Sequence, residues 1–275
     1  MDVLIALVIG LVAGLHTSTW GMYKDAPYEG FAWPKYFRST IIGGIVGVAV
    51  YWIVGLDVRS ASGMVVLFGF TYVIERALLE FYKTFLRVED QSKYFIPMQF
   101  SVKGEVVENR AIQLSVGFFW MGVVLSGVYG IYWLQKSAAL PSALYVLLLV
   151  GSFGGWISAI GGAWKDAPKE GFETLKFFRS PVIALIYAFV LAHFTDNYIL
   201  ISLGALGYTV ATIETYKTFF FPNKPRGKFA GKEIRYPEML ERRKYFVPIY
   251  VAIWAAIIVT MVVAFVQPHT GLLHA

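Results

Sequence analysis

The chain contains no cysteine and only four histidines among its 275 residues. Thiolate metal sites, cysteine nucleophiles and disulfide scaffolds are therefore excluded. Charge is also scarce, because 15% of residues are Asp, Glu, Lys or Arg, whereas soluble domains carry about 25%. The P-loop, Gly-x-Ser-x-Gly and His-Glu-x-x-His motifs do not occur. We accordingly expect no metal site and no cofactor, and the sequence identifies no catalytic residue.

Apolar residues are abundant instead, at 57% of the sequence, with 17% aromatic residues. A helix needs about 20 apolar residues to cross about 30 Å of hydrocarbon, and eight segments approach that length. We therefore expect an all-α polytopic membrane protein with about eight transmembrane helices. The expected spans lie near residues 3–22, 40–56, 63–85, 112–134, 141–163, 181–196, 198–219 and 246–267.

Lys and Arg gather in alternate loops. Of the 24, all but Arg59, Arg76 and Lys136 follow the first, third, fifth or seventh span. Because such loops face the cytoplasm, we expect a multi-pass protein of the cell membrane with both termini outside. Topology then accounts for the net charge of +6, so we expect membrane lipids as partners and no nucleic acid. A homo-oligomer or a complex with another membrane protein stays open.

Four short blocks of sequence occur twice, in the same order. The matched pairs are 23–31 with 164–172, 35–39 with 176–180, 80–85 with 214–219, and 93–97 with 244–248. They predict two tandem four-helix repeats, 1–135 and 136–275. Because four spans is an even number, both repeats enter the membrane in the same sense, which predicts a pseudo-two-fold axis along the membrane normal. The wider spacing of the last two blocks in the second repeat indicates a basic cytoplasmic loop insertion near 220–243.

The duplicated blocks also bring charged side chains to the cytoplasmic boundary. These are Lys24, Asp25, Glu29, Arg38 and Lys83 in the first repeat, and Lys165, Asp166, Glu170, Arg179, Glu214 and Lys217 in the second. We interpret them as a cytoplasmic gate made of ion pairs or as a site for an anionic headgroup. The alternative is interfacial anchoring of helices by Lys, Arg and aromatic rings, with the carboxylates balancing the charge.

Proline and glycine predict two local features. Pro27 interrupts helix continuation, so residues 24–27 are expected to form a turn outside the first span. Small-residue runs allow helices to approach closely, and we expect them to do so here. The runs are Gly10 with Gly14, Gly43 and Gly44 with Gly47, Gly154 with Gly155, and Gly161 with Gly162.

Ionisable residues also occur inside the expected spans. Glu75 lies about 18 Å into the third span and His16 about 20 Å into the first, so their depths are similar. Arg76 and Glu80 are four residues apart and can pair on one helix face. Such groups are costly in hydrocarbon unless paired or hydrated, so these four residues form a candidate ion, proton or substrate path, with proton exchange between His16 and Glu75. The alternative is a structural Arg76–Glu80 pair and a His16 bonded to a carbonyl group.

These features favour a transporter or channel-like protein for a small ion, a proton-coupled solute or an anionic amphiphile, gated by the repeat-related charge clusters. Two other classes remain open. One is a membrane-embedded enzyme acting on a phosphate-bearing lipid, with basic residues of the duplicated blocks on the phosphate and Asp25 or Glu29 as base. The other is a non-catalytic membrane subunit that scaffolds partner proteins, lipids or pigments.

Overall fold

The computed structural model describes residues 1–137, 144–224 and 226–274, and these residues are mostly helical. The α-helices are α1 (Asp2–Glu29), α2 (Trp33–Val54), α3 (Ala61–Phe81), α4 (Arg110–Lys136), α5 (Leu144–Gly151), α6 (Phe153–Glu170), α7 (Thr174–Ala192), α8 (Tyr198–Phe219), α9 (Glu238–Arg242) and α10 (Val247–Val266). Short turns of helix are η1 (Tyr82–Leu86), η2 (Gly227–Phe229), η3 (Arg243–Phe246) and η4 (Leu272–His274), and a hairpin joins β1 (Ser101–Val102) to β2 (Glu105–Val106). Residues 141–143 of the expected fifth span, and Pro225 of the expected basic loop, lie outside the described residues.

Seven helical segments within the described ranges are long and apolar enough to cross a membrane. They are α1, α2, α4, α5 with α6, α7, α8, and α9 through α10. The expected all-helical, multi-pass membrane architecture is therefore confirmed at this level. The expected span at 63–85 corresponds to α3, which is not among these seven helical segments. Helix α3 carries Glu75, Arg76 and Glu80. By contrast, α4 and α10 expose large apolar side chains such as Phe119 and Val266, as a lipid-facing helix does.

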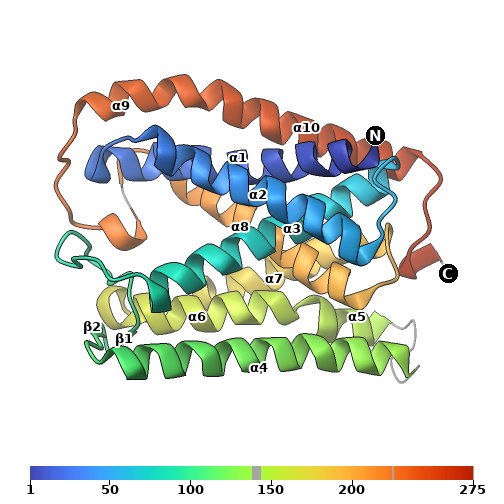
Figure 1. Ribbon diagram of the computed structural model, residues 1–275, viewed down its shortest axis with the longest axis horizontal. Coiled ribbons are helices and arrows are strands. Elements are labelled where there is room, and N and C mark those ends of the chain that lie inside the picture. Colours follow the sequence, from blue (N-terminus) through green and yellow to red (C-terminus); the bar gives the residue numbers. More distant parts are fainter. Residues whose placement is uncertain (138–143, 225, 275) are drawn as a thin grey trace.

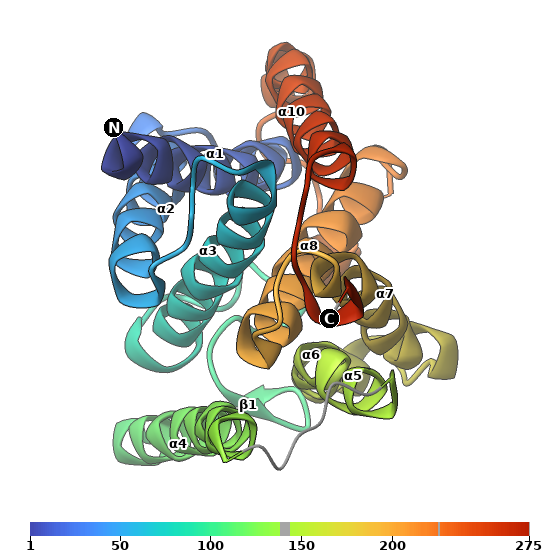
Figure 2. The same cartoon turned by 90° about the vertical axis from the view of Figure 1, so that its right-hand side faces the viewer.

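The long helices run side by side along one axis. Figure 1 shows both termini at one end and the β1–β2 hairpin at the other, which we call the hairpin end. Figure 2 shows α3 and α8 near the centre, with α1 and α2 on one side, α6 and α7 on the other, and α10 and α4 lying across from each other. Helix α10 packs against α3, and α4 packs against α8. The last long helix of each half of the chain therefore contacts the other half.

Glycine brings the two central helices into close contact. A Cβ atom added at Gly207 in α8 would lie 1.9 Å from the carbonyl oxygen of Gly69 in α3, which no real side chain tolerates. Beside this crossing, the buried Tyr208 hydroxyl donates a hydrogen bond of 2.8 Å to the Val65 carbonyl oxygen. In an apolar setting such close packing and interhelical hydrogen bonds are the main attractive terms between helices. The crossing therefore fixes how the two halves meet.

Two further crossings of this kind lie within the halves. A Cβ atom at Gly14 of α1 would lie 2.1 Å from the Ser39 oxygen of α2, and one at Gly155 of α6 would lie 2.7 Å from the Ser180 oxygen of α7. The expected close packing at the first three glycine runs is therefore confirmed. At Gly161 and Gly162 it is wrong, because a Cβ atom there would meet nothing within 4 Å.

The turn expected at residues 24–27 is also wrong. Helix α1 continues through Pro27 to Glu29, and Gly30, with φ of 74°, ends it. Proline has no N–H group, so the carbonyl four residues earlier, that of Tyr23, loses its helical partner. The Arg243 side chain donates a hydrogen bond of 3.3 Å to that oxygen and so replaces the missing donor. A distant part of the chain thus stabilises the last turn of α1.

A test of the central crossing compares Gly207→Ala with Gly122→Ala in α4, where an added Cβ meets nothing within 4 Å. We expect Gly207→Ala to lower the free energy of unfolding by about 1–3 kcal/mol, the usual cost of overpacking, and Gly122→Ala to leave it unchanged or slightly raised. Thermal unfolding of both variants in one detergent measures the difference. Equal midpoints would show that α3 and α8 do not depend on this contact.

Candidate functional site

A cluster of charged side chains surrounds Glu214 near the hairpin end of α8. Its carboxylate accepts a hydrogen bond of 2.8 Å from the Lys24 ammonium of α1. Lys217, one turn further along α8, lies 3.7 Å from the other carboxylate oxygen. The side chains of Lys24 and Glu214 are only 17% and 16% exposed, so much of their hydration has been replaced by the pairing.

A second cluster surrounds Glu80 at the same end of α3. Its carboxylate pairs with Arg76 one turn earlier and with Lys83, whose ammonium lies 3.5 Å away. The third partner comes from α6, where the Lys165 ammonium lies 4.0 Å from the second carboxylate oxygen. The expected pairing of Arg76 with Glu80 is present, and Arg76 also lies over the Trp20 ring at 5.3 Å.

The two clusters are arranged reciprocally. Glu80 and Glu214 occupy matching positions in one pair of duplicated blocks, and Lys24 and Lys165 occupy matching positions in another. Each carboxylate pairs with the lysine of the opposite half of the chain, so that α1 is tied to α8 and α6 is tied to α3. Sequence reasoning found these residues but gave no sign that the pairs cross between the halves.

The first Asp-Ala-Pro block is covered by residue Lys228 of η2. Its ammonium lies 2.7 Å from the Asp25 carboxylate and 3.0 Å from that of Glu29, and it also faces the Phe229 ring at 4.6 Å. Burial alone would lower the pKa of Lys228, but the two carboxylates outweigh it and hold that pKa above its usual range. The basic insertion is therefore packed onto α1 through a buried ammonium group.

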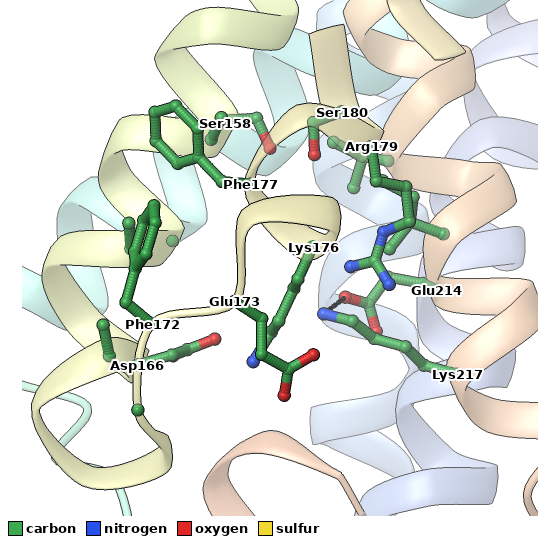
Figure 3. Close-up of a pocket in the computed structure, with 17 residues that line it drawn as sticks. Ser158, Asp166, Phe172, Glu173, Lys176, Phe177, Arg179, Ser180, Glu214 and Lys217 are labelled. Carbon is green, nitrogen blue, oxygen red and sulfur yellow. Dashed lines mark ion pairs between the residues drawn. The ribbon is translucent and has the colours of Figure 1, made fainter. Parts of the chain in front are cut away.

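The second Asp-Ala-Pro block, residues 166–168 of α6, borders a cavity and is not covered in this way. Glu170 pairs with Lys176, whereas Asp166 has no ion pair or hydrogen bond within the described ranges. A cavity of about 130 Å³ lies beside Asp166 between α6, α7 and α8. Figure 3 shows Asp166 on one wall, with Arg179, Glu214 and Lys217 on the other. Nothing in the sequence predicted that the two matching blocks would differ in this way.

The two matching arginines, Arg38 and Arg179, share one feature, which Arg87 and Arg243 also have. In both, the Nε atom is buried and has no hydrogen-bond partner in the described part of the chain. A buried donor without a partner costs free energy, so such groups mark places where a partner is expected. Of the two arginines, Arg179 lines the cavity.

The intramembrane residues lie in a buried polar network between α1 and α3. His16 and Glu75 are both fully buried. The His16 Nδ1 atom lies 3.1 Å from the Tyr72 hydroxyl, and Thr17 donates a hydrogen bond of 3.3 Å to Glu75. His16 and Glu75 therefore have separate partners, while His16 Nε2 and Glu75 Oε1 have none in the described part of the chain.

Sequence reasoning missed the residues that hold this network together. Trp20 donates a hydrogen bond of 3.1 Å to the Tyr72 hydroxyl, and the Tyr250 ring of α10 lies 4.6 Å from the His16 ring. Helical spacing could have indicated Trp20, which lies four residues after His16, and Tyr72, which lies three before Glu75. The contribution of α10 has no signal in the sequence.

No family model, curated protein or solved structure matches this chain. The site is therefore interpreted from its own geometry and chemistry.

Removal of the Lys228 ammonium tests whether it stabilises the fold. Lys228→Met leaves Asp25 and Glu29 without their cation, and we expect the free energy of unfolding to fall by roughly 1–3 kcal/mol. Lys224→Met is the matched control, since Lys224 is exposed in the same segment and forms no ion pair with any described residue. Thermal unfolding followed by tryptophan fluorescence compares them. Adding Asp25→Asn and Glu29→Gln to Lys228→Met should recover stability, and a control as unstable as Lys228→Met would contradict the assignment.

Proposed function

We propose that this protein is a membrane transporter for a small charged solute or amphiphile, and that the crossed ion pairs at the hairpin end form its gate. The observation that carries the proposal is the reciprocal pairing of Lys24 with Glu214 and of Lys165 with Glu80. A scaffold has no need of pairs that cross between two halves at one end. A gate does, because separating the halves there breaks both pairs together.

The proposal includes two tandem repeats related by a pseudo-two-fold axis along the membrane normal. Three observations support it besides the duplicated blocks. Helix α10 packs on α3 as α4 packs on α8. The Gly14–Ser39 contact has a counterpart in Gly155–Ser180, at matching positions. Both α1 and α6 continue through a proline and end at a glycine with positive φ.

The proposed orientation has the hairpin end in the cytoplasm and both termini outside the cell membrane. The charge distribution of the loops supports it. The position of both termini at the opposite end, which Figure 1 shows, agrees with an even number of crossings. In this orientation the two charge clusters and the cavity at Asp166 face the cytoplasmic side.

The role of the gate is tested by charge reversal. Lys24→Glu places two carboxylates side by side. We expect it to lower flux by about tenfold or more, since opposed like charges cost several kcal/mol. Glu214→Lys should do the same. The double variant restores the pair in reverse and should recover most of the flux. Uptake of radiolabelled phosphate and phosphoethanolamine into vesicles containing the full chain measures this.

The control is Lys169→Glu, which reverses the charge of an exposed ion pair to Glu105 at the hairpin. Its flux should equal that of the unchanged protein. Equal effects of this control and Lys24→Glu, or a double variant no better than either single variant, would contradict gating by crossed pairs. Folding of every variant is checked by its elution from a sizing column.

The buried carboxylate makes a separate prediction about coupling. Glu75 has one oxygen without a hydrogen-bond partner among the described residues and accepts a hydrogen bond from Thr17, so a change in its charge has a large energetic effect on the network. We expect Glu75→Gln to abolish proton-coupled flux while the protein stays folded. Proton entry into the same vesicles, followed with an enclosed pH dye, measures the loss. Unchanged proton entry in a folded variant would remove Glu75 from the path.

A further inference from the structure

The cavity between α6, α7 and α8 is lined by two carboxylates, Asp166 and Glu173, and one guanidinium group, Arg179, that form no ion pair with any described residue. Of its charged lining residues, Lys176 is paired with Glu170, and Lys217 with Glu214. Asp166 and Arg179 form no ion pair with any described residue, while Glu173 lies at the exposed rim. Figure 3 shows Asp166 and Arg179 on opposite walls. The cavity therefore presents a negative group and a positive group to whatever enters between them.

The other half of the chain indicates what Asp166 binds. Asp25 occupies the matching position in the first block, and there it holds the primary ammonium group of Lys228 at 2.7 Å. The same run of sequence in α6 places Asp166 in the same helical setting, before a proline and a terminal glycine. In the second half, the described residues supply no ammonium group to it. An ammonium group from outside the chain would complete the equivalent arrangement.

The inserted segment explains why only one of the two places is open. Met239 and Phe246 pack in one cluster with Met22 and Tyr36, while Lys228 pairs with Asp25. The matching residues in the second half, Ala163 and Phe177, line the cavity instead. The place beside Asp25 is therefore covered by the chain itself, whereas a cavity lies beside Asp166.

Arg179 supplies the complement at the other wall. A guanidinium group binds phosphate and carboxylate groups through parallel N–H donors, and the buried Nε atom of Arg179 lacks any partner in the described ranges. Lys176 and Lys217 are paired with Glu170 and Glu214, so Arg179 is the cation of the lining that is available to a phosphate. The cavity volume of about 130 Å³ is far more than one water molecule needs.

We propose that this cavity binds an aminoalkyl phosphate, with its primary ammonium group on Asp166 and its phosphate on Arg179. An aminoalkyl phosphate can be a small soluble molecule or the headgroup of an aminophospholipid. Identifying it with the transported species rests on the proposed function, whereas its binding does not. A zwitterionic ligand would pair with both walls of the cavity, whereas a simple anion would pair with Arg179 alone.

Calorimetric titration of the full chain in detergent with phosphoethanolamine tests the binding. Native mass spectrometry of protein from nanodiscs containing phosphatidylethanolamine or phosphatidylglycerol tests the lipid source. We expect phosphoethanolamine, or phosphatidylethanolamine in preference to phosphatidylglycerol, to bind. Inorganic phosphate or ethanolamine alone should bind about tenfold more weakly or worse, because each leaves one charged group unpaired. Asp166→Asn and Arg179→Gln should weaken binding of the zwitterion by a similar factor.

A pair of glycine variants separates blockage of the cavity from loss of folding. Gly162 lines the cavity, and Gly21 is its counterpart in α1; an added Cβ meets nothing within 4 Å at either. Gly162→Leu should abolish binding and Gly21→Leu should retain it, with both proteins eluting as the unchanged one does.

Three results would overturn the ligand inference. They are no binding of either aminoalkyl phosphate form, binding of inorganic phosphate as tight as that of phosphoethanolamine, and binding that survives Gly162→Leu. Because binding is measured without flux, a ligand that binds but is not moved across vesicles would overturn transport alone. Flux without binding in the cavity would overturn the ligand site alone.

Discussion

The close crossing of α3 and α8 is the contact on which the rest of the arrangement depends. Gly69 and Gly207 allow the two backbones to touch, and the hydrogen bond from Tyr208 to Val65 adds a polar contact beside the crossing. Since both helices then run toward the hairpin end, Glu80 and Glu214 emerge from the central pair at the same end of the molecule. At that end, Lys24 of α1 pairs with Glu214 and Lys165 of α6 pairs with Glu80. The positions of the ion pairs thus follow from a glycine contact between the two central helices.

The segment near 220–243, with η3 after it, makes the surroundings of the duplicated blocks in α1 and α6 unequal. Lys228 covers Asp25, and Arg243 replaces the hydrogen bond that Pro27 cannot make. In the second half Asp166 lacks a cation within the described ranges and faces a cavity. The segment near 220–243 and η3 therefore stabilise the end of α1, whereas the cavity beside Asp166 in α6 stays accessible.

The sequence was sufficient for features that depend on composition and short-range pattern. Apolar length predicted the helices, and the duplicated blocks predicted which charged residues gather together. It failed at Pro27, where the helix continues and the distant Arg243 bonds the carbonyl oxygen that the proline leaves without a helical partner. It also gave no sign of the cavity, because distant segments decide what packs on the matching blocks of α1 and α6. For His16, the partner Tyr72 was within reach of helical spacing, whereas Tyr250 was not.

The strengths of the two kinds of contact suit the proposed gate. The Lys24–Glu214 and Lys165–Glu80 side chains keep part of their exposure, so water solvates the separated charges and lowers the cost of breaking both pairs, which the differential binding of a small ligand offsets. Close packing of helix backbones at Gly207 costs more to disturb, and it lies away from the charged end. A movement that keeps the central crossing and separates the hairpin ends of the halves is therefore the least costly one. Such a movement would widen access to the cavity between α6, α7 and α8. It would also expose the hairpin end of α3, close to Arg76 and the buried Glu75.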